Sequence, residues 1–184
     1  EDSAVASLEI MQEHYAWNGQ QMEAAAAAAE VGAGGLMALP LGHGTKHQGG
    51  EGMFHGVTTG NFTPGNMARA SLEGVAVGLA YGFHRMRELE IDFQTVCVTG
   101  KGVGSKLWRQ LLADVCGVQT YSLKNQEGAA LGAAIHAAVA YFRQTGESLS
   151  FSEMAAYAVV AEDDSWCTPD EGRHKFYLDQ LSKQ

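Results

Sequence analysis

The feature that most constrains the fold is a glycine-rich turn between a β-branched apolar segment and a helix. Phe93–Val98 is a strand candidate that runs directly into Thr99-Gly-Lys-Gly-Val-Gly-Ser105. A helix is expected next, from Lys106 to about Val115, closed by Gly117. Such a turn brings backbone N–H groups and a helix N-terminus together, which suits an anion. Its glycines also leave room for a flat ring to approach the backbone.

Two better-known nucleotide motifs do not fit this turn. A P-loop needs the order Gly-Lys-Ser/Thr, whereas the chain has Gly104-Ser105-Lys106. The dinucleotide fingerprint needs its third glycine where Ser105 stands, and it belongs in the first βα unit of a domain rather than late in the chain. From its residues alone, the turn is therefore either a nucleotide site or a tight connection between a strand and a helix.

The other expected elements alternate between strands and helices. We expect helices over 3–16, Gln20–Glu30 (with Gly19 as the break between these two), Pro64 to about Glu88, Gln126 to about Phe142, near 151–160 and near 169–182, and strands over Leu36–Leu41, Met53–Val57 and Val118–Tyr121. The expected caps are Thr63, Asn125 and the capping boxes Ser150-x-x-Glu153 and Thr168-x-x-Glu171. This order predicts an α/β sheet covered by helices.

The long helix that starts at Pro64 carries two further expectations. Its core face is predicted to hold Met67, Ser71, Val75, Leu79, Phe83 and Met86. Gly74, Gly78 and Gly82 are spaced four residues apart, and glycine is unfavourable inside a helix. We therefore expect another element to pack closely against this glycine face.

The composition limits the class of protein. A length of 184 residues with 46% hydrophobic residues suffices for one domain, expected to cover 1–184. A net charge of −9 argues against general binding to nucleic acid or to anionic membranes. The three cysteines are widely spaced, as reduced thiols would be, and the acidic start is unlike a signal peptide. These features predict a cytoplasmic protein.

A second motif carries a family resemblance. Gly52-Met-Phe-His-Gly-Val57 is followed by the spacer 58–65 and then by Asn66-Met-x-x-Ala-Ser-Leu-Glu73. This pattern resembles the C-terminal signature of the FGGY carbohydrate kinases. The resemblance extends over nearly the whole chain and is closest to the xylulose kinases. Thr99–Gln110 resembles the adenosine segment of the family, Glu127–Ala134 resembles its Glu-x-x-Ala-x-Gly-Ala-Ala helix, and Leu36–Leu41 resembles its Leu-Pro segment.

The resemblance implies a fold and an activity. The fold would be the C-terminal lobe of an actin/hexokinase-like (ribonuclease H-like) ATPase, helix-rich and without the opening β-hairpin. The activity would be transfer of the γ-phosphate of ATP, bound as its Mg²⁺ complex, to a sugar hydroxyl, with a ketopentose such as xylulose as acceptor. The residues implied to bind the nucleotide are Gly100, Lys101, Gly102, Val103 and Ser105.

The resemblance also implies what this chain lacks. In the family, the aspartate that accepts the proton of the attacking hydroxyl belongs to the first lobe, and no residue here matches it; Asp92 and Asp114 lie in no corresponding motif. We therefore expect no catalytic residue in this chain, no activity for it alone, and an N-terminal lobe as its partner. Without that lobe, an uncovered strand edge and apolar surface are expected to cause self-association.

Several single residues carry expectations of their own. Trp108 is expected in the core, Arg109 at the surface or between lobes, and Glu73 in a buried structural role. Gly128 and Gly132 are expected to pack against a neighbouring element, with Gly128 flanking the adenine. The chain departs from the family pattern at Lys101 and Gly104, and in the loop Gly42-His-Gly-Thr-Lys-His47 after Pro40.

Two other functions stay open beside the sugar kinase. One is a non-catalytic nucleotide-binding or regulatory module. The other is a metal-dependent enzyme that uses His43, His47 and His55 with Glu51, although this spacing on a glycine-rich loop favours ordinary surface histidines. No metal ligand is therefore assigned.

Overall fold

The computed structural model describes residues 9, 11–39, 53–100, 102–147 and 149–181. Residues 11–15 are helical and precede the first element with defined bounds. In chain order the elements are α2 (Gly19–Ala28), the 3-10 turn η1 (Ala33–Gly35), β1 (Met37–Leu39), β2 (Met53–His55), α3 (Pro64–Glu88), β3 (Thr95–Val98), α4 (Lys106–Cys116), β4 (Gln119–Ser122), α5 (Gly128–Gln144), α6 (Phe151–Ala158), the 3-10 turn η2 (Asp163–Ser165) and α7 (Glu171–Leu181). The expected helix-rich α/β class is confirmed.

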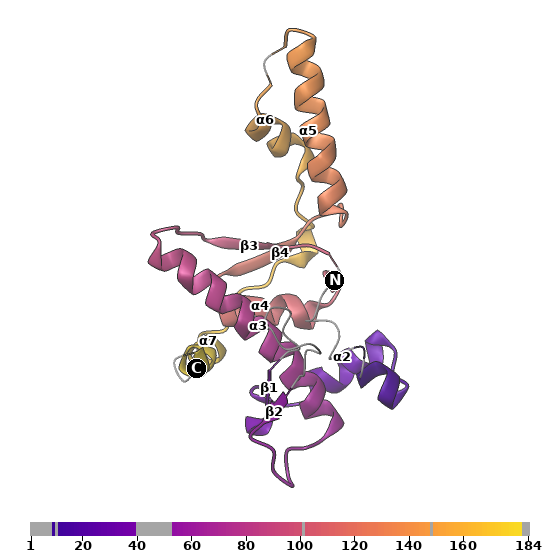
Figure 1. Ribbon diagram of the computed structural model, residues 1–184, viewed down its shortest axis with the longest axis vertical. Coiled ribbons are helices and arrows are strands. Elements are labelled where there is room, and N and C mark those ends of the chain that lie inside the picture. Colours follow the sequence, from indigo (N-terminus) through magenta and orange to yellow (C-terminus); the bar gives the residue numbers. More distant parts are fainter. Residues whose placement is uncertain (1–8, 10, 40–52, 101, 148, 182–184) are drawn as a thin grey trace, which may run out of the picture.

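The strands form two separate two-stranded sheets. β1 and β2 are antiparallel, with Met37 opposite His55, and β3 and β4 are parallel, with Thr95 opposite Gln119. Figure 1 shows β3 and β4 across the middle of the molecule, with α3 and α4 on one side of them and β1 and β2 at the far end of α3. The central helix α3 packs against α2, β1, α4 and α7, so it joins most of the fold.

The hydrophobic core lies where α3, α4 and α7 meet the β3–β4 sheet. Its buried members include Leu72, Leu111, Leu112, Val115 and Tyr177. Small residues on α3 allow this close helix packing, since Ala68, Ala76 and Ala80 are also buried. The core therefore joins α7, from the end of the chain, to helices that lie far before it in the sequence.

The expected core face of α3 is only partly right in its second half, where Phe83 packs against the core. The helix starts as expected, because the Thr63 hydroxyl accepts a hydrogen bond from the Asn66 N–H at 3.2 Å and Pro64 occupies the first turn. Leu79 and Met86, however, are exposed. The second half buries Ala76, Val77 and Ala80 instead, on the side of the helix that packs against α4.

The expected packing against the glycines of α3 is not found at Gly78 and Gly82. A Cβ atom added at Gly78 or Gly82 would meet no atom of the described residues within 4 Å. These two glycines thus lie on an open face of the helix.

Three helix starts differ from the expectation. The break before α2 lies at Ala16, which has a positive φ of 51°, and Asn18 forms a capping box with Gln21, so Gly19 is the first helical residue. α5 starts after Glu127 rather than after Asn125, whose side chain accepts from the Glu127 N–H at 3.0 Å. α7 starts at Glu171 rather than near 169.

β1 is a strand but not a buried one. Met37 and Leu39 are exposed, and only Ala38 between them is buried. The reason is that β1 has α3 on one face and no described residue covering the other. Pro40 and Leu41, which were expected to end this strand, lie outside the described residues.

The two edges of the β3–β4 sheet differ. Along β4, Thr120 exchanges two backbone hydrogen bonds with Cys167, at 3.0 and 2.9 Å, and Leu123 bridges to Ala161. β3 has β4 as its one strand partner among the described residues. An uncovered strand edge, as the resemblance implied, is therefore present at β3.

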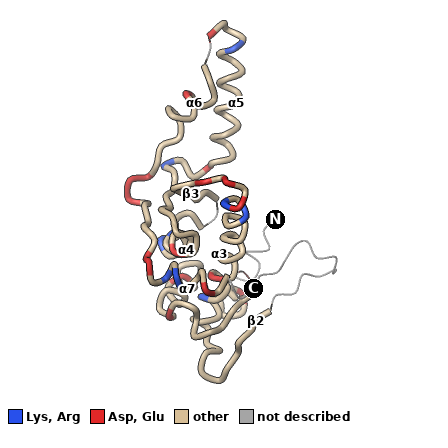
Figure 2. Tube along the Cα trace, turned by 90° about the vertical axis from the view of Figure 1, so that its left-hand side faces the viewer, with Lys and Arg blue, Asp and Glu red and all other residues tan. Residues whose placement is uncertain are grey.

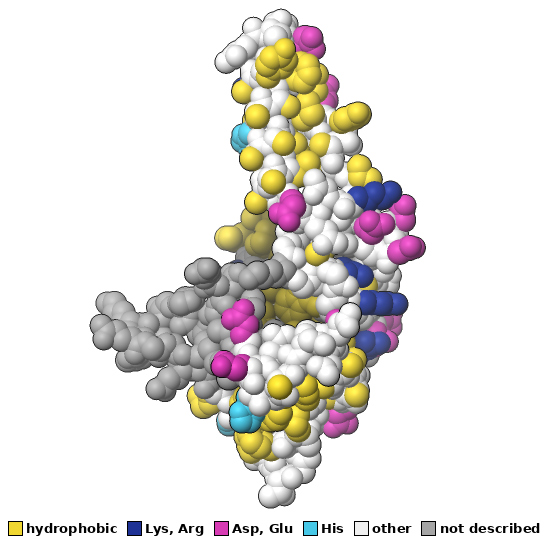
Figure 3. Space-filling view, turned by 90° about the vertical axis from the view of Figure 1, so that its right-hand side faces the viewer, with side chains coloured by type: hydrophobic (Ala, Val, Ile, Leu, Met, Phe, Trp, Pro, Cys, Tyr) yellow, Lys and Arg dark blue, Asp and Glu magenta, His cyan; other side chains and the backbone are white. Residues whose placement is uncertain are grey.

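The hairpin of α5 and α6 stands apart from the rest of the molecule, at the top of Figure 1. The two helices pack against each other. Figure 2 shows few charged residues along them, and Figure 3 shows hydrophobic side chains over the same part. None of the described helices combines the length and apolar character needed to cross a membrane.

Candidate nucleotide-binding site

The glycine-rich turn has the strand–turn–helix geometry expected from its sequence. It leaves the end of β3, forms two successive tight turns, and enters α4. The Val103 N–H donates to the Gly100 carbonyl at 3.2 Å, and the Ser105 N–H donates to the Gly102 carbonyl at 2.9 Å. Gly100 and Gly102 have φ values of 85° and 89°, a region that favours glycine. Lys101 lies outside the described residues.

The backbone of this turn is open on one side. A Cβ atom at Gly100 or Gly104 would meet no atom within 4 Å, and one at Gly102 would lie 3.7 Å from Cδ1 of Trp108. Val103, by contrast, is buried and anchors the turn to the interior. Among the described residues, no side chain would therefore block a planar group that approaches the backbone at Gly100 or Gly104.

Ser105 has a well-defined structural role at the site. Its hydroxyl accepts from the Trp108 N–H at 3.0 Å, as an N-cap of α4. It also donates to Oε1 of Glu23 at 2.7 Å, which ties α2 to the start of α4. Since its hydroxyl and its N–H are both engaged, Ser105 shapes the turn rather than leaving a free donor.

The N-terminus of α5 lies beside the turn. A Cβ atom at Gly128 would come within 3.4 Å of Cγ2 of Thr99, the residue just before Gly100. The expected close packing at Gly128 is thus confirmed. At Gly132 the same expectation is wrong, because a Cβ atom there would meet nothing within 4 Å. Gly128 thus flanks the turn, and its place beside the adenine stays a prediction.

The position expected for Arg109 is wrong. Its residue is only 8% exposed, and its guanidinium donates through Nη1 to the Val103 carbonyl and through Nε to the Ser165 carbonyl at 3.1 Å. Helix periodicity could have revealed this burial, because Arg109 lies three and seven residues before the core residues Leu112 and Cys116. Trp108 packs against the core as expected.

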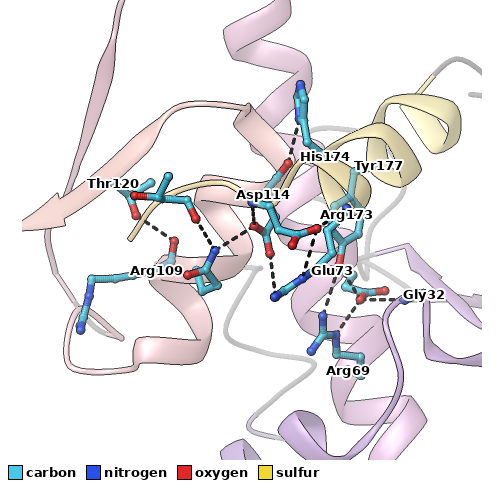
Figure 4. A network of polar contacts seen from close by, with 12 residues as sticks. Gly32, Arg69, Glu73, Arg109, Asp114, Thr120, Arg173, His174 and Tyr177 are labelled. Carbon is cyan, nitrogen blue, oxygen red and sulfur yellow. Dashed lines mark hydrogen bonds and ion pairs between the residues drawn. The ribbon is translucent and has the colours of Figure 1, made fainter. Parts of the chain in front are cut away.

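Glu73 has the buried structural role that was expected. Its Oε1 accepts from the Gly32 N–H at 3.0 Å, from Nε of Arg69 at 2.6 Å and from the Tyr177 hydroxyl at 2.8 Å (Figure 4). Burial alone would lower the pKa of Arg69, but the hydrogen bonds to Glu73 and Tyr177 outweigh it and raise that pKa. Glu73 therefore joins α3, the turn before β1 and α7 through a charged centre.

Asp114 is a second buried centre and not a catalytic candidate. One carboxylate oxygen accepts from Nε2 of Gln110 and from the Asp170 N–H, both at 2.8 Å, and the other accepts from Nη1 of Arg173 at 3.1 Å. Its carbonyl oxygen lies 2.9 Å from Nδ1 of His174 (Figure 4). These contacts fix α7 on α4, so the carboxylate is already used by the fold.

The histidines of the metal hypothesis are not brought together as a described site. His43, His47 and Glu51 lie outside the described residues, and His55 is exposed on β2. Within the described part of the chain, no group of three His, Cys, Asp or Glu side chains is placed to hold a metal ion. All three cysteines are free, with Cys97 exposed and Cys116 and Cys167 buried.

Comparison with known proteins defines the class. The family described as "FGGY family of carbohydrate kinases, C-terminal domain" matches residues 5–141. The chain therefore belongs to the FGGY family of carbohydrate kinases, in the part that forms their C-terminal domain. The expected fold, the C-terminal lobe of the actin/hexokinase-like type, is confirmed by this match and by the solved structures below.

Individual relatives are xylulose kinases. The chain is 31% identical over 121 residues to xylulose kinase of Haemophilus influenzae, and 37% identical over 117 residues to that of Staphylococcus epidermidis. These matches cover 64% and 61% of the chain, but 24% and 23% of the relatives. The crystal structure of xylulose kinase from Rhodospirillum rubrum superposes with a TM-score of 0.76 at 27% identity, over 97% of this chain and 36% of that one. The chain thus spans about a quarter of the length of the curated relatives it matches.

Proposed function

We propose that the chain is the ATP-binding part of a sugar kinase that transfers the γ-phosphate of ATP to a sugar hydroxyl. The acceptor we propose is a ketopentose such as xylulose. Membership of the family and the similarity to xylulose kinases support this choice. The proposed unit is one domain over 1–184, in a cytoplasmic protein, with an N-terminal lobe as its partner.

The observation that carries the proposal is the open backbone of the glycine-rich turn. Gly100 and Gly104 present a bare surface that fits a planar adenine, and Gly128 borders it. The turn lies between β3 and the N-terminus of α4, where backbone N–H groups favour an anionic ligand. We propose that Gly100, Lys101, Gly102, Val103 and Ser105 hold the adenosine part of ATP. The bound nucleotide would supply the phosphoryl group, with Mg²⁺ on its phosphates.

In this proposal the residues of the chain bind and orient the nucleotide, and neither Asp92 nor Asp114 fits the role of proton acceptor. Asp92 is exposed and accepts from Nε2 of Gln94 at 3.2 Å, and Asp114 is committed to α7. Phosphoryl transfer needs an acceptor hydroxyl in line with the γ-phosphate and a group to orient it. We therefore propose that this group lies in the partner lobe and that the 184-residue chain alone does not turn over sugar.

The binding site can be tested by Gly102→Val. A β-branched residue at a φ of 89° is strained, by about 1–3 kcal/mol, and its side chain would cover the backbone that adenine needs. Gly146→Val is the matched control, because Gly146 also has a positive φ, of 86°, with open space around it, but lies at the far end of α5. Calorimetric titration with Mg-ATP should show binding lost in Gly102→Val and kept in Gly146→Val. Equal affinity in the two variants would exclude this turn as the site.

The absence of turnover can be tested by a coupled assay with xylulose, ribulose and glycerol. We expect ADP production at background level for the purified chain. Turnover that persists after contaminating kinases are removed would contradict the need for a second lobe. An upstream lobe encoded in the same gene would favour the kinase over a stand-alone nucleotide-binding module.

A further inference from the structure

We propose that Arg109 is a positioning residue that holds the glycine-rich turn in its nucleotide-binding shape. This inference rests on the proposed function, because it assigns the regulation of affinity to the same turn. Arg109 belongs to α4, and its guanidinium donates to the Val103 carbonyl of the turn, while an added Cβ atom at Gly100 or Gly104 would meet no atom of the described residues within 4 Å. It would act on the nucleotide through the turn and without touching the ligand.

The Arg109 guanidinium donates hydrogen bonds to two main-chain carbonyls. Its Nη1 donates to the carbonyl of Val103, in the middle of the turn, and its Nε donates to the carbonyl of Ser165, in η2, at 3.1 Å. Two carbonyls from segments far apart in the sequence are thereby joined by one planar group. Arginine suits this role because its donors form a rigid fork, whereas lysine offers a single compact charge.

Ser165, whose carbonyl accepts from Arg109, is itself held in place by several hydrogen bonds. The Ser165 hydroxyl accepts from the Ser122 N–H at 2.9 Å and donates to the Glu162 carbonyl at 2.6 Å. The backbone pairing of Thr120 with Cys167 fastens the same segment along β4. The carbonyl of Ser165 is therefore a fixed point against which the turn can be held.

The glycine-rich turn needs a contact from outside itself to hold its shape. Gly100, Gly102 and Gly104 give the turn backbone freedom that residues with a Cβ atom would not have. Two internal hydrogen bonds hold it, at Val103 and Ser105. An added bond from a charged donor in a buried position is stronger than a neutral one, and here it fixes the carbonyl between two of the glycines.

The positive charge of the Arg109 guanidinium supports the same role. Arg109 is buried, and no carboxylate of the described residues forms an ion pair with it. Its charge is compensated by the two carbonyls, so each of those bonds matters to the guanidinium as well as to the turn. The bracing segment, residues 162–167, lies beyond the part matched to the family, 5–141. The inference thus gives the C-terminal segment a part in nucleotide binding.

The test compares Arg109→Gln and Arg109→Lys with Arg87→Gln. Arg87 is the matched control, because it also donates to a main-chain carbonyl, that of Cys116 at 3.3 Å, but lies away from the turn. Amide hydrogen exchange is measured without nucleotide, and Mg-ATP affinity is measured by titration. We expect both Arg109 variants to exchange faster at Val103 and Ser105, and Arg109→Gln to bind ATP about tenfold more weakly, as the loss of one charge-assisted hydrogen bond would give. Arg109→Lys should fall between the wild type and Arg109→Gln, and Arg87→Gln should show neither effect.

The readouts separate positioning from general stability. A purely structural role for Arg109 would raise exchange in the core of α3 and α4 as well, and that result would overturn the proposal. If Gly102→Val abolishes binding while Arg109→Gln keeps full affinity, the inference fails and the proposed function stands. If the wild type binds no ATP, the proposed function fails, and the nucleotide-positioning role fails with it. Should Arg109→Gln not fold, Arg109→Lys, which keeps the charge and the apolar stem, decides between the same outcomes.

Discussion

Glu73 brings three donors from distant parts of the chain to a single oxygen. Gly32 precedes β1, Arg69 lies one turn earlier on α3, and Tyr177 belongs to α7. A buried carboxylate is costly unless it is paired and hydrogen-bonded, and here both conditions hold. The residue that the family signature ends on thus fastens the C-terminal helix to α3, as Asp114 fastens it to α4.

At this scale, we expect Tyr177→Phe to lower the free energy of unfolding by about 1–2 kcal/mol, because Glu73 loses one of its three donors while remaining buried. Burial raises the pKa of Tyr177, so its hydroxyl stays protonated and able to donate at neutral pH. Tyr157→Phe is the control, since Tyr157 is 85% exposed, and it should change stability by less than about 0.5 kcal/mol. Urea denaturation measures both. Equal stability of the two variants would contradict the role given to Tyr177.

Individual residues were predictable where a motif or a local rule applied to them. Glu73 followed from the family signature, and Thr63 followed from its place before a proline. Arg109 was misplaced because a charged side chain is usually exposed, and only the turn and the distant carbonyl of Ser165 make its burial favourable. Ser165 lies 56 residues further along the chain, and no local sequence pattern indicates that its carbonyl accepts a hydrogen bond from Arg109.

Among the elements, α7 shows best how caps decide a boundary. The box Thr168-x-x-Glu171 was expected to start this helix, but the helix begins at Glu171. Asp170 provides the cap instead, with its carboxylate accepting from the Arg173 N–H at 2.9 Å. Its own N–H is held by Asp114 at 2.8 Å, which fixes the start of the helix from outside. Tertiary contact thus overrode a local signal.

We expect alanine substitutions at Asp170 and at Thr168 to lower the stability of the protein by unequal amounts. Asp170→Ala should destabilise the protein by about 1 kcal/mol, because it removes the capping acceptor of α7. Thr168→Ala should cost clearly less, since its hydroxyl only accepts a long contact of 3.4 Å from Gln119. Thermal unfolding of the two variants side by side is the measurement. A larger loss of stability in Thr168→Ala than in Asp170→Ala would contradict this expectation and assign the cap to Thr168.

The strength of local signals explains which elements were predictable. α3, α4 and α6 carry a good N-cap and a clear start, and their bounds agree with the expectation. The open face of α3 at Gly78 and Gly82 was not predictable, because a glycine spacing indicates a neighbour without saying whether the chain itself supplies it. The same holds for Gly132 on α5.

Among the surfaces that the described residues leave uncovered, two bear on self-association. One is the free edge of β3, and the other is the α5–α6 hairpin, where Tyr141, Phe151 and Tyr157 are exposed (Figures 1 and 3). Unpaired strand edges and contiguous apolar patches are the usual sites of association.

We therefore predict that the chain self-associates through the hairpin. Light scattering across a dilution series should show mass falling towards that of a monomer as concentration decreases. Tyr157→Asp should shift this transition to higher concentration, because it places a charge on the apolar surface. Leu89→Asp makes the same change at the exposed end of α3, outside the hairpin, and should leave the transition in place. A monomer throughout the micromolar range, with no apolar dye bound, would contradict this prediction.

The central claim is that ATP binds over the glycine-rich turn. Its most direct test is to follow the backbone amide resonances of the isotopically labelled chain while Mg-ATP is added. The account predicts saturable shifts concentrated at Gly100, Gly102, Val103 and Gly104, with smaller ones at Gly128, and little change along β2 or α7. Absence of saturable shifts at the turn, or shifts centred elsewhere in the molecule, would contradict it.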